Sequence, residues 1–345
     1  MGSALRPPSA VETLGQGVRD TVAAGPACAS VHPMRVVLVH LGSPLPKHAR
    51  ICIRQATAAS GEPPVVVGPA AARRLQSEAR ARFRQVESLS GMGLKHFWRY
   101  ACERFFVLEA AMRAMNLDRC IHIECDVLMY ASPASYGEWL IDTYGAGLAT
   151  CPLTDLEDTA AVMYVGSRAA LASFNTALLD LVALSPAEFV AVHGGEMAHE
   201  MRMMNVLRTE LGLAASLPTT VASAHELGSA YVFDPASYGQ YVDGVPAEPG
   251  VAYAGDHHRV GRELLSGNYR LRWDAQQRIP LVASGGDQSE CPLATLHIHS
   301  KRLERWAWDE GPPRAHANPL SRARDRLRPR LGAIRRAVDF ARRDS

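Results

Sequence analysis

The sequence lacks the features that would at once assign a chain to a membrane, secreted or redox class. Its seven cysteines form no CxxC pair, so neither a zinc ribbon nor a disulfide framework is expected and a reducing compartment is favoured. No apolar run reaches the roughly 18 residues that cross a bilayer, and the N-terminus shows no secretory signal pattern. The net charge of +2 is too small to favour nucleic acid binding. We therefore expect a cytoplasmic protein that binds no nucleic acid.

Three common site signatures are also missing. There is no GxxxxGK[ST] loop, no GxGxxG between a strand and a helix, and no GxSxG elbow. These absences argue against a P-loop protein, a dinucleotide-binding enzyme of the usual type and an α/β-hydrolase. Hydrophobic residues make up 47% of the chain and charged residues 21%, a balance that supports a sizeable core.

Apolar runs that flank a helix predict the fold class. Continuous apolar runs at 34–41 and 63–69 indicate buried strands, and a helix over 47–59 connects them. This order is typical of an α/β protein with a mostly parallel sheet that helices cover on both faces. The clearest helix is 95–115, where apolar residues recur every three or four positions. Further elements are expected as strands at 147–151, 160–166 and 294–301, helices at 168–183 and 196–211, and a loop-dominated segment at 230–262.

A pair of carboxylates stands in the stretch IHIECDVLMY, residues 121–130. Alternation along a strand puts Glu124 and Asp126 on the same face, about 6.6 Å apart. Two nearby carboxylates repel, so they need a cation, a hydrogen-bond network or raised pKa values. A divalent ion held by oxygen ligands would remove the conflict. The alternative is that Glu124 pairs with an arginine and Asp126 caps the following turn.

A second group of polar residues lies near the end of the last predicted strand, in LHIHSKRLERW. His297 and His299 share one strand face, and Lys301 follows within two residues. A neutral imidazole can complete a Mn²⁺-type site, and a lysine beside it can neutralise phosphate charge. The alternative is that one of the two histidines is a buried core residue.

Four blocks of the sequence resemble one enzyme family. FWRYACERFFVLEAAMRAMNLDRCIHIECDVLMY, YVFDPASYGQYVDG and ATLHIHSKRL are similar, in that order, to blocks of bacterial nucleotide-sugar-dependent glycosyltransferases of the GT-A fold. VLVHLGSPLPKH resembles the first strand and loop of the same group. The resemblance covers roughly residues 34–308 and implies a single large domain with a Rossmann-like, mostly parallel sheet.

The resemblance also implies a metal–diphosphate site. Asp126 would hold Mn²⁺ or Mg²⁺ that bridges the diphosphate of a nucleotide-sugar donor, with UDP as the expected nucleotide. Glu124 stands where many members have the first Asp of a DxD motif, so it would touch the metal, the ribose or the donor sugar. His297 or His299 would supply the third protein ligand, with His299 preferred, and Lys301 would contact the diphosphate.

Further site residues follow from the same resemblance. His40, Gly42 and Ser43, at the end of the first strand, would line the base and ribose pocket. Glu200 would be a catalytic carboxylate, either a base for the acceptor hydroxyl or a group that holds the donor sugar. Its alternative is a solvated first turn of a helix, which a carboxylate stabilises. Asp234 would contact the sugar, or would cap the turn that follows it.

The expected activity is transfer of a hexose from a nucleotide diphosphate to a glycan or lipid-linked acceptor, as in polysaccharide biosynthesis. One alternative is a nucleotidylyltransferase, although HLGSPLPKH lacks the Gly-rich, Arg-containing loop that such enzymes need after the first strand. Another is a catalytically inactive carbohydrate-binding or scaffold protein of the same fold.

The two ends of the chain differ in composition from the predicted catalytic domain at 34–310. Residues 1–33 are rich in Ala, Gly, Pro and Ser and are expected to form a flexible arm. The tail at 311–345 includes a basic amphipathic stretch, 318–345, with nine Arg and three Asp. It would pack on the body or bind an anionic membrane, which would place the protein at the inner face of the membrane. The segment 239–262 is a candidate lid over the site.

Overall fold

The computed structural model describes residues 34–75, 78–84, 97–195, 198–246, 248–249, 257–274, 276–286 and 289–308. All of them belong to the unit Met34–Ser345. The arm predicted at 1–33 and the tail predicted at 311–345 lie outside the described residues, as do residues 247 and 250–256 of the lid predicted at 239–262.

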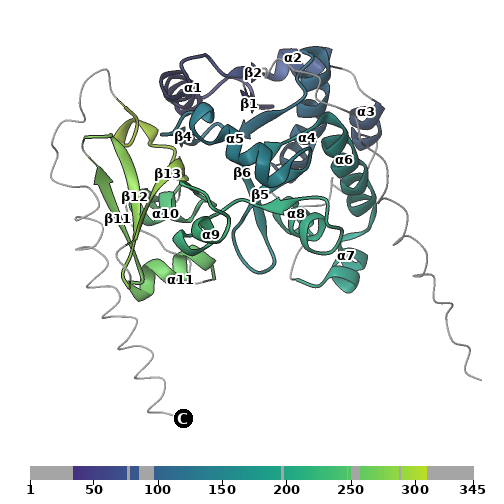
Figure 1. Ribbon diagram of the computed structural model, residues 1–345. Helices are drawn as coiled ribbons and strands as arrows, with labels where there is room; N and C mark the ends of the chain where they lie inside the picture. The colour runs from purple at the N-terminus through teal and green to yellow at the C-terminus, as the bar shows by residue number, and fades with distance from the viewer. Residues whose placement is uncertain are drawn as a thin grey trace, which may run out of the picture. The chain divides into compact units, whose positions relative to one another are not determined.

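A six-stranded sheet forms the larger part of the fold (Figure 1). In sheet order its strands are β2 (Val65–Val67), β1 (Arg35–Val39), β3 (Cys120–Ile123), β6 (Asp158–Val165), β5 (Leu148–Pro152) and β7 (Ala215–Ser216). The pairs β1–β2, β1–β3 and β5–β7 are parallel, whereas β6 runs antiparallel to both of its neighbours. The predicted α/β class with a mostly parallel sheet flanked by helices is therefore confirmed.

Both faces of this sheet are buried, which explains why its strands read as continuous apolar runs. Along β1, Val36 and Leu38 join one hydrophobic cluster, and Val37 and Val39 join another. The first cluster includes side chains of α1 (Lys47–Ser60) and α5 (Pro133–Tyr144). The second includes those of α4 (Phe97–Ala114), α6 (Arg168–Ala183) and α8 (Glu200–Thr209). Helices thus cover the two faces that alternate residues of each strand present.

The remaining helices are short. They are α2 (Pro69–Arg74), α3 (Glu78–Arg84), α7 (Pro186–His193), α9 (Val221–Glu226), α10 (Ser237–Asp243), α11 (Arg259–Ser266) and the 3₁₀ turn η2 (Leu303–Arg305). The segment 230–262 was predicted to be loop-dominated, but it contains α10 and the first half of α11. Among the described helices no single one is long and apolar enough to cross a membrane, and only α6 and α7 taken together, bent by 113°, pass such a test of length and composition.

A smaller sheet packs beside the larger one and carries the C-terminal part of the domain (Figure 1). Its path is β11 (Tyr269–Asp274), β12 (Ile279–Ser284), β13 (Glu290–His297) and β4 (Val127–Met129), all antiparallel, with β8 (Val232–Phe233) parallel to β13. A separate pair joins β9 (Gly244–Val245) to β10 (Glu248–Pro249). Only β13 was predicted from the sequence, as a strand at 294–301, and it begins and ends earlier than expected.

The strand predicted to carry both Glu124 and Asp126 is in fact two strands. β3 ends at Ile123 in the larger sheet and β4 begins at Val127 in the smaller one. The chain passes from one sheet to the other in the turn between them, so the prediction that the two carboxylates share one strand face was wrong. Apolar and polar residues alternate from 121 to 126 and a continuous apolar run follows at 127–130, a pattern that is compatible with one strand and does not reveal a break between two buried strands.

Candidate metal centre

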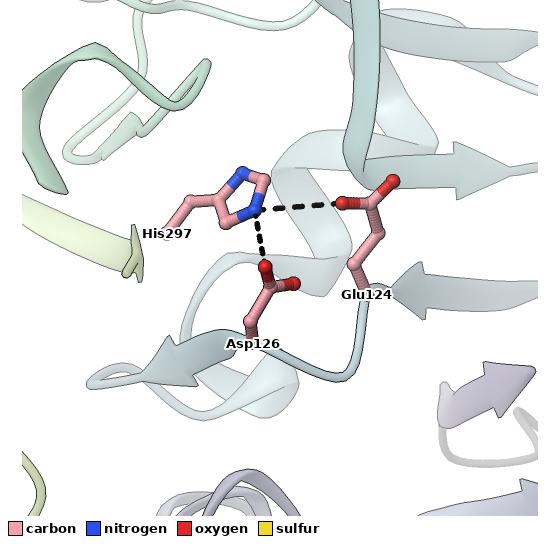
Figure 2. Close-up of side chains that lie close together, drawn as sticks. All are labelled: Glu124, Asp126 and His297. Carbon is pink, nitrogen blue, oxygen red and sulfur yellow. Dashed lines mark hydrogen bonds and ion pairs between the residues drawn. The ribbon is translucent and has the colours of Figure 1, made fainter. Parts of the chain in front are cut away.

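Glu124, Asp126 and His297 point toward one another where the two sheets meet (Figure 2). One ligand atom from each lies within 4.8 Å of the others. Nε2 of His297 is 2.9 Å from Oδ2 of Asp126 and 3.5 Å from Oε2 of Glu124. Asp126 and His297 are buried and Glu124 is half-buried. The expected proximity of the two carboxylates is therefore present, although a turn and not a strand provides it.

Backbone pairing brings these residues together across 171 positions of sequence. β4 pairs antiparallel with β13, and His297 stands opposite Val127. Immediately beyond this pair, the backbone N–H of Ile298 donates to the carbonyl of Asp126 at 2.9 Å. On the other side, the N–H of Glu124 donates to the carbonyl of Ala161 in β6 at 3.0 Å. The turn is thus fixed at both ends, one in each sheet.

Asp234 holds the backbone around His297. Its carboxylate accepts hydrogen bonds from the N–H groups of His297 at 2.9 Å, Gly239 at 2.9 Å and Tyr238 at 3.0 Å. It is fully buried, so burial raises the pKa of Asp234 against the lowering effect of these donors. The structure therefore supports the capping alternative, and the predicted direct contact of Asp234 with a sugar is corrected to a positioning role.

Helix α10 approaches the end of β13 unusually closely. A Cβ atom added to Gly239 would lie 1.8 Å from the carbonyl oxygen of His297. Any residue other than glycine would therefore overlap this oxygen. The contact is between two backbones, so a neighbouring side chain cannot relieve it by rotating. Gly239 is therefore required for α10 to support His297 at this position.

Glu124, Asp126 and His297 are called the centre below. At the centre, nearby opposite charges shift the pKa values of Asp126 and His297 more than burial does. Burial raises the pKa of Asp126, but His297 and Lys301 together hold it well below its usual value of 3.8. Burial lowers the pKa of His297, but Asp126 and Glu124 raise it overall. The ammonium group of Lys301 contacts Oδ2 of Asp126, the same oxygen that faces the imidazole. This places the predicted diphosphate-binding lysine at the centre.

Arg104, on α4, connects two carboxylates. One guanidinium nitrogen contacts Oε1 of Glu124 and another contacts Oε1 of Glu200. Burial raises the pKa of Glu124, but Arg104 and His297 together lower it below its usual value. At Glu200 burial prevails over Arg104 and the pKa is raised. The alternative in which Glu124 pairs with an arginine is confirmed, although nothing in the sequence indicated which arginine it would be.

Glu200 is the first residue of α8 and is only 3% exposed. It is therefore not the solvated helix turn that the sequence left open. Its contact with Arg104 brings it to the border of the centre, and the chain of contacts from Glu200 through Arg104 ends at Glu124.

His299 lies beside the centre and outside the group of three ligands. Its ring centroid is 4.4 Å from that of His297, and its Nδ1 is 3.4 Å from Nε2 of Gln240 on α10. Burial, with His297 next, lowers the pKa of His299 to about 3. Because β13 ends at His297, the two imidazoles do not extend from one strand face as the sequence predicted. The geometry thus favours His297 over His299 as the nitrogen ligand.

The segment that carries Lys301 is anchored by one buried carboxylate. Asp243, at the end of α10, is fully buried and contacts Ser300, Arg302 and Arg305. Lys301 lies between the first two of these and has a positive φ of 62°. The anchor fixes the direction in which the lysine leaves the backbone. Sequence reasoning missed Asp243 because its partners lie about 60 positions away, with separations of 57 to 62.

His40, Gly42 and Ser43 follow β1, as predicted. His40 is half-buried, and burial lowers its pKa. Gly42 and Ser43 are exposed, and a Cβ atom on Gly42 would lie 3.1 Å from Nε2 of His40. Nε2 of His48, in helix α1, is 3.6 Å from the thiol of Cys125, which lies in the turn between β3 and β4. The start of α1 therefore borders the centre, and the role of the loop after β1 in a nucleotide pocket stays a prediction.

The donor set fits a divalent ion. Two carboxylates and one imidazole offer two hard oxygen ligands and one nitrogen ligand. Carboxylates suit Mg²⁺ and Mn²⁺, and a nitrogen ligand is more compatible with Mn²⁺ than with Mg²⁺, which prefers oxygen. With only three protein ligands, positions would remain for oxygens of a bound substrate. Oδ2 of Asp126 is shared between Lys301 and His297, so an ion would compete with the lysine for it.

Comparisons with known proteins give distant similarities. No family model matches the chain, and no curated protein matches it. Mouse xyloside xylosyltransferase 1 in its apo form is 12% identical with a TM-score of 0.34, over 54% of this chain and 85% of that one. A glycosyltransferase involved in glycosylation of the major capsid of PBCV-1 is 11% identical with a TM-score of 0.32, over 56% of this chain and 88% of that one. These scores are too low to carry a functional assignment, which therefore depends on the site itself.

Proposed function

We propose that the protein is a metal-dependent glycosyltransferase that uses a nucleotide diphosphate sugar, with UDP as the nucleotide and a glycan or lipid-linked acceptor. The observation that carries this proposal is the convergence of Glu124, Asp126 and His297, with Lys301 on the same carboxylate oxygen. Such a group combines ligands for a divalent ion with a cation for phosphate. The sequence resemblance to GT-A enzymes supports the same assignment.

Each residue of the centre has a part in the proposed reaction. In transfer, the bond from the sugar's anomeric carbon to the diphosphate breaks and the nucleoside diphosphate leaves, a bond to an acceptor oxygen forms, and the proton of the acceptor hydroxyl passes to solvent. A bound Mn²⁺ or Mg²⁺ would stabilise the negative charge that develops on the diphosphate. Asp126, His297 and Glu124 would hold the ion, and Lys301 would contact the diphosphate. His40, Gly42 and Ser43 would line the base and ribose pocket.

Glu200 is assigned a positioning role in this proposal. Its carboxylate is occupied by Arg104, and its side chain is 4% exposed. A base for an acceptor hydroxyl has to reach that hydroxyl, whereas this group reaches the guanidinium. Through Arg104 it fixes Oε1 of Glu124 and leaves Oε2 on the side of His297.

Calorimetry with UDP tests the proposal. The wild-type protein should bind UDP only weakly without metal and more tightly with Mn²⁺. Asp126→Asn should lose the effect of Mn²⁺, whereas the control Asp142→Asn, which changes an exposed carboxylate on α5, should retain it. Binding of UDP by the wild type that does not depend on metal, or an Asp126→Asn variant that keeps full Mn²⁺ dependence, would contradict the assignment. Mn²⁺-dependent hydrolysis of different nucleotide sugars, followed by product NMR, would identify the donor.

The proposal extends to the location of the enzyme. We place it in the cytoplasm, in polysaccharide biosynthesis, with the basic stretch 318–345 in contact with the inner face of the membrane. Co-sedimentation with anionic vesicles should be lost when the chain is truncated after Pro319. Absence of vesicle binding by the full-length protein would remove this part of the proposal and leave the metal centre unaffected.

A further inference from the structure

A second group of polar and aromatic side chains lies next to the metal centre. Glu157 is in the loop between β5 and β6, His199 is the N-cap of α8, and Trp98 is in the first turn of α4. Nε2 of His199 is 3.0 Å from Oε1 of Glu157. The rings of His199 and Trp98 are stacked, with centroids 4.8 Å apart and an interplanar angle of 26°. The proposed reaction has given none of the three a role.

The hydrogen bonds of His199 indicate which of its ring nitrogens carries the proton. The backbone N–H of Arg202 donates to Nδ1 at 3.4 Å, so Nδ1 is an acceptor. In a neutral imidazole the proton is then on Nε2, which donates it to Oε1 of Glu157. His199 is buried, held between this cap and the ring of Trp98. It is therefore a rigid donor that fixes one oxygen of the carboxylate.

Glu157 is arranged to receive a hydroxyl group. Its side chain is 24% exposed, so the carboxylate is fixed on one side and reached by solvent on the other. The hydrogen bond from His199 is the main cause of the lowered pKa of Glu157, and the group is thus ionised at neutral pH. An ionised carboxylate is a strong hydrogen-bond acceptor for hydroxyls and repels phosphates and anionic lipids.

An exposed aromatic ring adjoins this pair through Trp98. Phe97 is 56% exposed, which is unusual for a side chain of this size. Phe97 meets Trp98 edge to face with centroids 5.0 Å apart. Sugars present apolar C–H faces to aromatic rings and hydroxyls to carboxylates. A lipid chain would use the rings alone, so the combination of rings with Glu157 selects a sugar.

The group is continuous with the metal centre. His199 precedes Glu200, which contacts Arg104, which in turn contacts Glu124. Phe97 and Arg104 are seven positions, or about two turns, apart on α4 and therefore share one face of that helix. The span from the first ring to the guanidinium is about 10 Å along the helix axis. A sugar bound at the rings would lie beside the centre.

We propose that Glu157, His199 and Trp98, with the exposed ring of Phe97, form the acceptor subsite, which binds a sugar residue of a glycan. This inference rests on the proposed function, since an acceptor has meaning only for a transferase. The inference concerns the binding of the acceptor alone and changes no step of the proposed reaction.

Saturation-transfer NMR on the full-length protein with Mn²⁺ and UDP tests the subsite. The probes are the methyl glycosides of glucose, galactose, mannose and N-acetylglucosamine. At least one should bind, and Glu157→Gln should weaken it about tenfold because a charge-assisted hydrogen bond becomes a neutral one. The amide oxygen of that variant can still accept from His199, which preserves the local fold. Trp98→Ala should also weaken binding.

Control experiments separate this inference from the proposed function. Glu138→Gln, a change at an exposed carboxylate of α5, should leave glycoside binding unchanged. The Mn²⁺-dependent affinity for UDP should be the same in Glu157→Gln as in the wild type. The subsite is wrong if no glycoside binds the wild type. It is also wrong if Glu157→Gln and Trp98→Ala bind the glycoside as tightly as the wild type does. Either result holds even where UDP binding persists. If UDP does not bind with Mn²⁺ while a glycoside binds at Glu157, the proposed function fails and the sugar site stands.

Discussion

Replacing Lys301 with methionine should strengthen the binding of Mn²⁺ to the protein alone. The ammonium group contacts Oδ2 of Asp126, an oxygen that the ion also requires. In the wild type the ion has to displace the lysine, and in the variant this competition is absent. Methionine keeps an unbranched side chain of similar length, so the anchor that Asp243 provides to the neighbouring residues is retained.

The magnitude follows from the surroundings of the contact. A hydrogen bond to a charged group contributes about 1.5–3 kcal/mol, but the Lys301 side chain is 41% exposed and solvent screens the pair toward the smaller values found at surfaces. We therefore take about 1–2 kcal/mol, which corresponds to a roughly 5- to 30-fold increase in affinity for Mn²⁺. The affinity for UDP in the presence of Mn²⁺ should fall, because the variant lacks the cation for the diphosphate.

Binding of Mn²⁺ can be followed by electron paramagnetic resonance, with and without UDP. In the wild type UDP should enhance Mn²⁺ binding, since a diphosphate draws Lys301 away from Asp126; by linkage, Mn²⁺ should enhance UDP binding by the same factor. In Lys301→Met this mutual enhancement should shrink. Lys47→Met, at a lysine that is 82% exposed, is the matched control and should behave as wild type. Unchanged or weaker Mn²⁺ binding by Lys301→Met would refute the competition.

Three further results are expected. Arg104→Met should lower the free energy of unfolding by about 3–5 kcal/mol, because it leaves the buried Glu200 without its counter-ion and removes the arginine partner of the half-buried Glu124. Gly239→Ala should cost about 1–3 kcal/mol and weaken Mn²⁺ binding, since the new methyl group meets the carbonyl of His297. The pKa of Asp126 is lowered in the folded protein, so its ionised form adds stability that is complete above its usual value and is lost as the pH falls below it. The difference in unfolding free energy between wild type and Asp126→Asn should therefore narrow as the pH falls from about 5 to about 3.

Urea unfolding measures the three stability changes, at one pH for Arg104→Met and Gly239→Ala and at a series of pH values for Asp126→Asn. Adding Glu200→Gln to Arg104→Met should restore part of the lost stability, because one of the two uncompensated charges is then removed. Gly286→Ala, where nothing lies within 4 Å of the added Cβ, is the control for Gly239→Ala. The first prediction is contradicted if Arg104→Met is as stable as the wild type, and the second if the two alanine variants have equal effects. The third is contradicted if the difference in unfolding free energy between wild type and Asp126→Asn widens as the pH falls.

The sequence predicted elements with a strong local pattern and missed those that depend on distant partners. β1, α1 and α4 were expected close to their observed bounds because each has a continuous or periodic apolar pattern. In the smaller sheet, β8 has two residues and β4 three, too few for a periodic signal, whereas β11 and β12 were missed although each has six residues. The break between β3 and β4 was hidden because both strands are apolar and fully buried.

The same contrast holds at the site. Asp126, Glu124, His297 and Lys301 were predicted because they belong to short motifs, and the structure brings them together. Arg104 was not, because it lies 20 positions before Glu124 in a helix with several other arginines. A buried carboxylate requires a partner, but chemistry alone does not say which distant side chain provides it.

The turn between β3 and β4 has a consequence for the order of synthesis and folding. Its carboxylates belong to the first half of the chain, whereas His297 lies 171 positions after Asp126 and arrives only when β13 pairs with β4. Contacts of such long sequence separation form late because they close a large loop. A nascent chain that has emerged only as far as β12 would have the larger sheet without a functional cation site. The group of Glu124, Asp126 and His297 would thus be complete only after nearly the whole domain has left the ribosome, and under the proposed function an incomplete chain would not bind a donor through a metal ion.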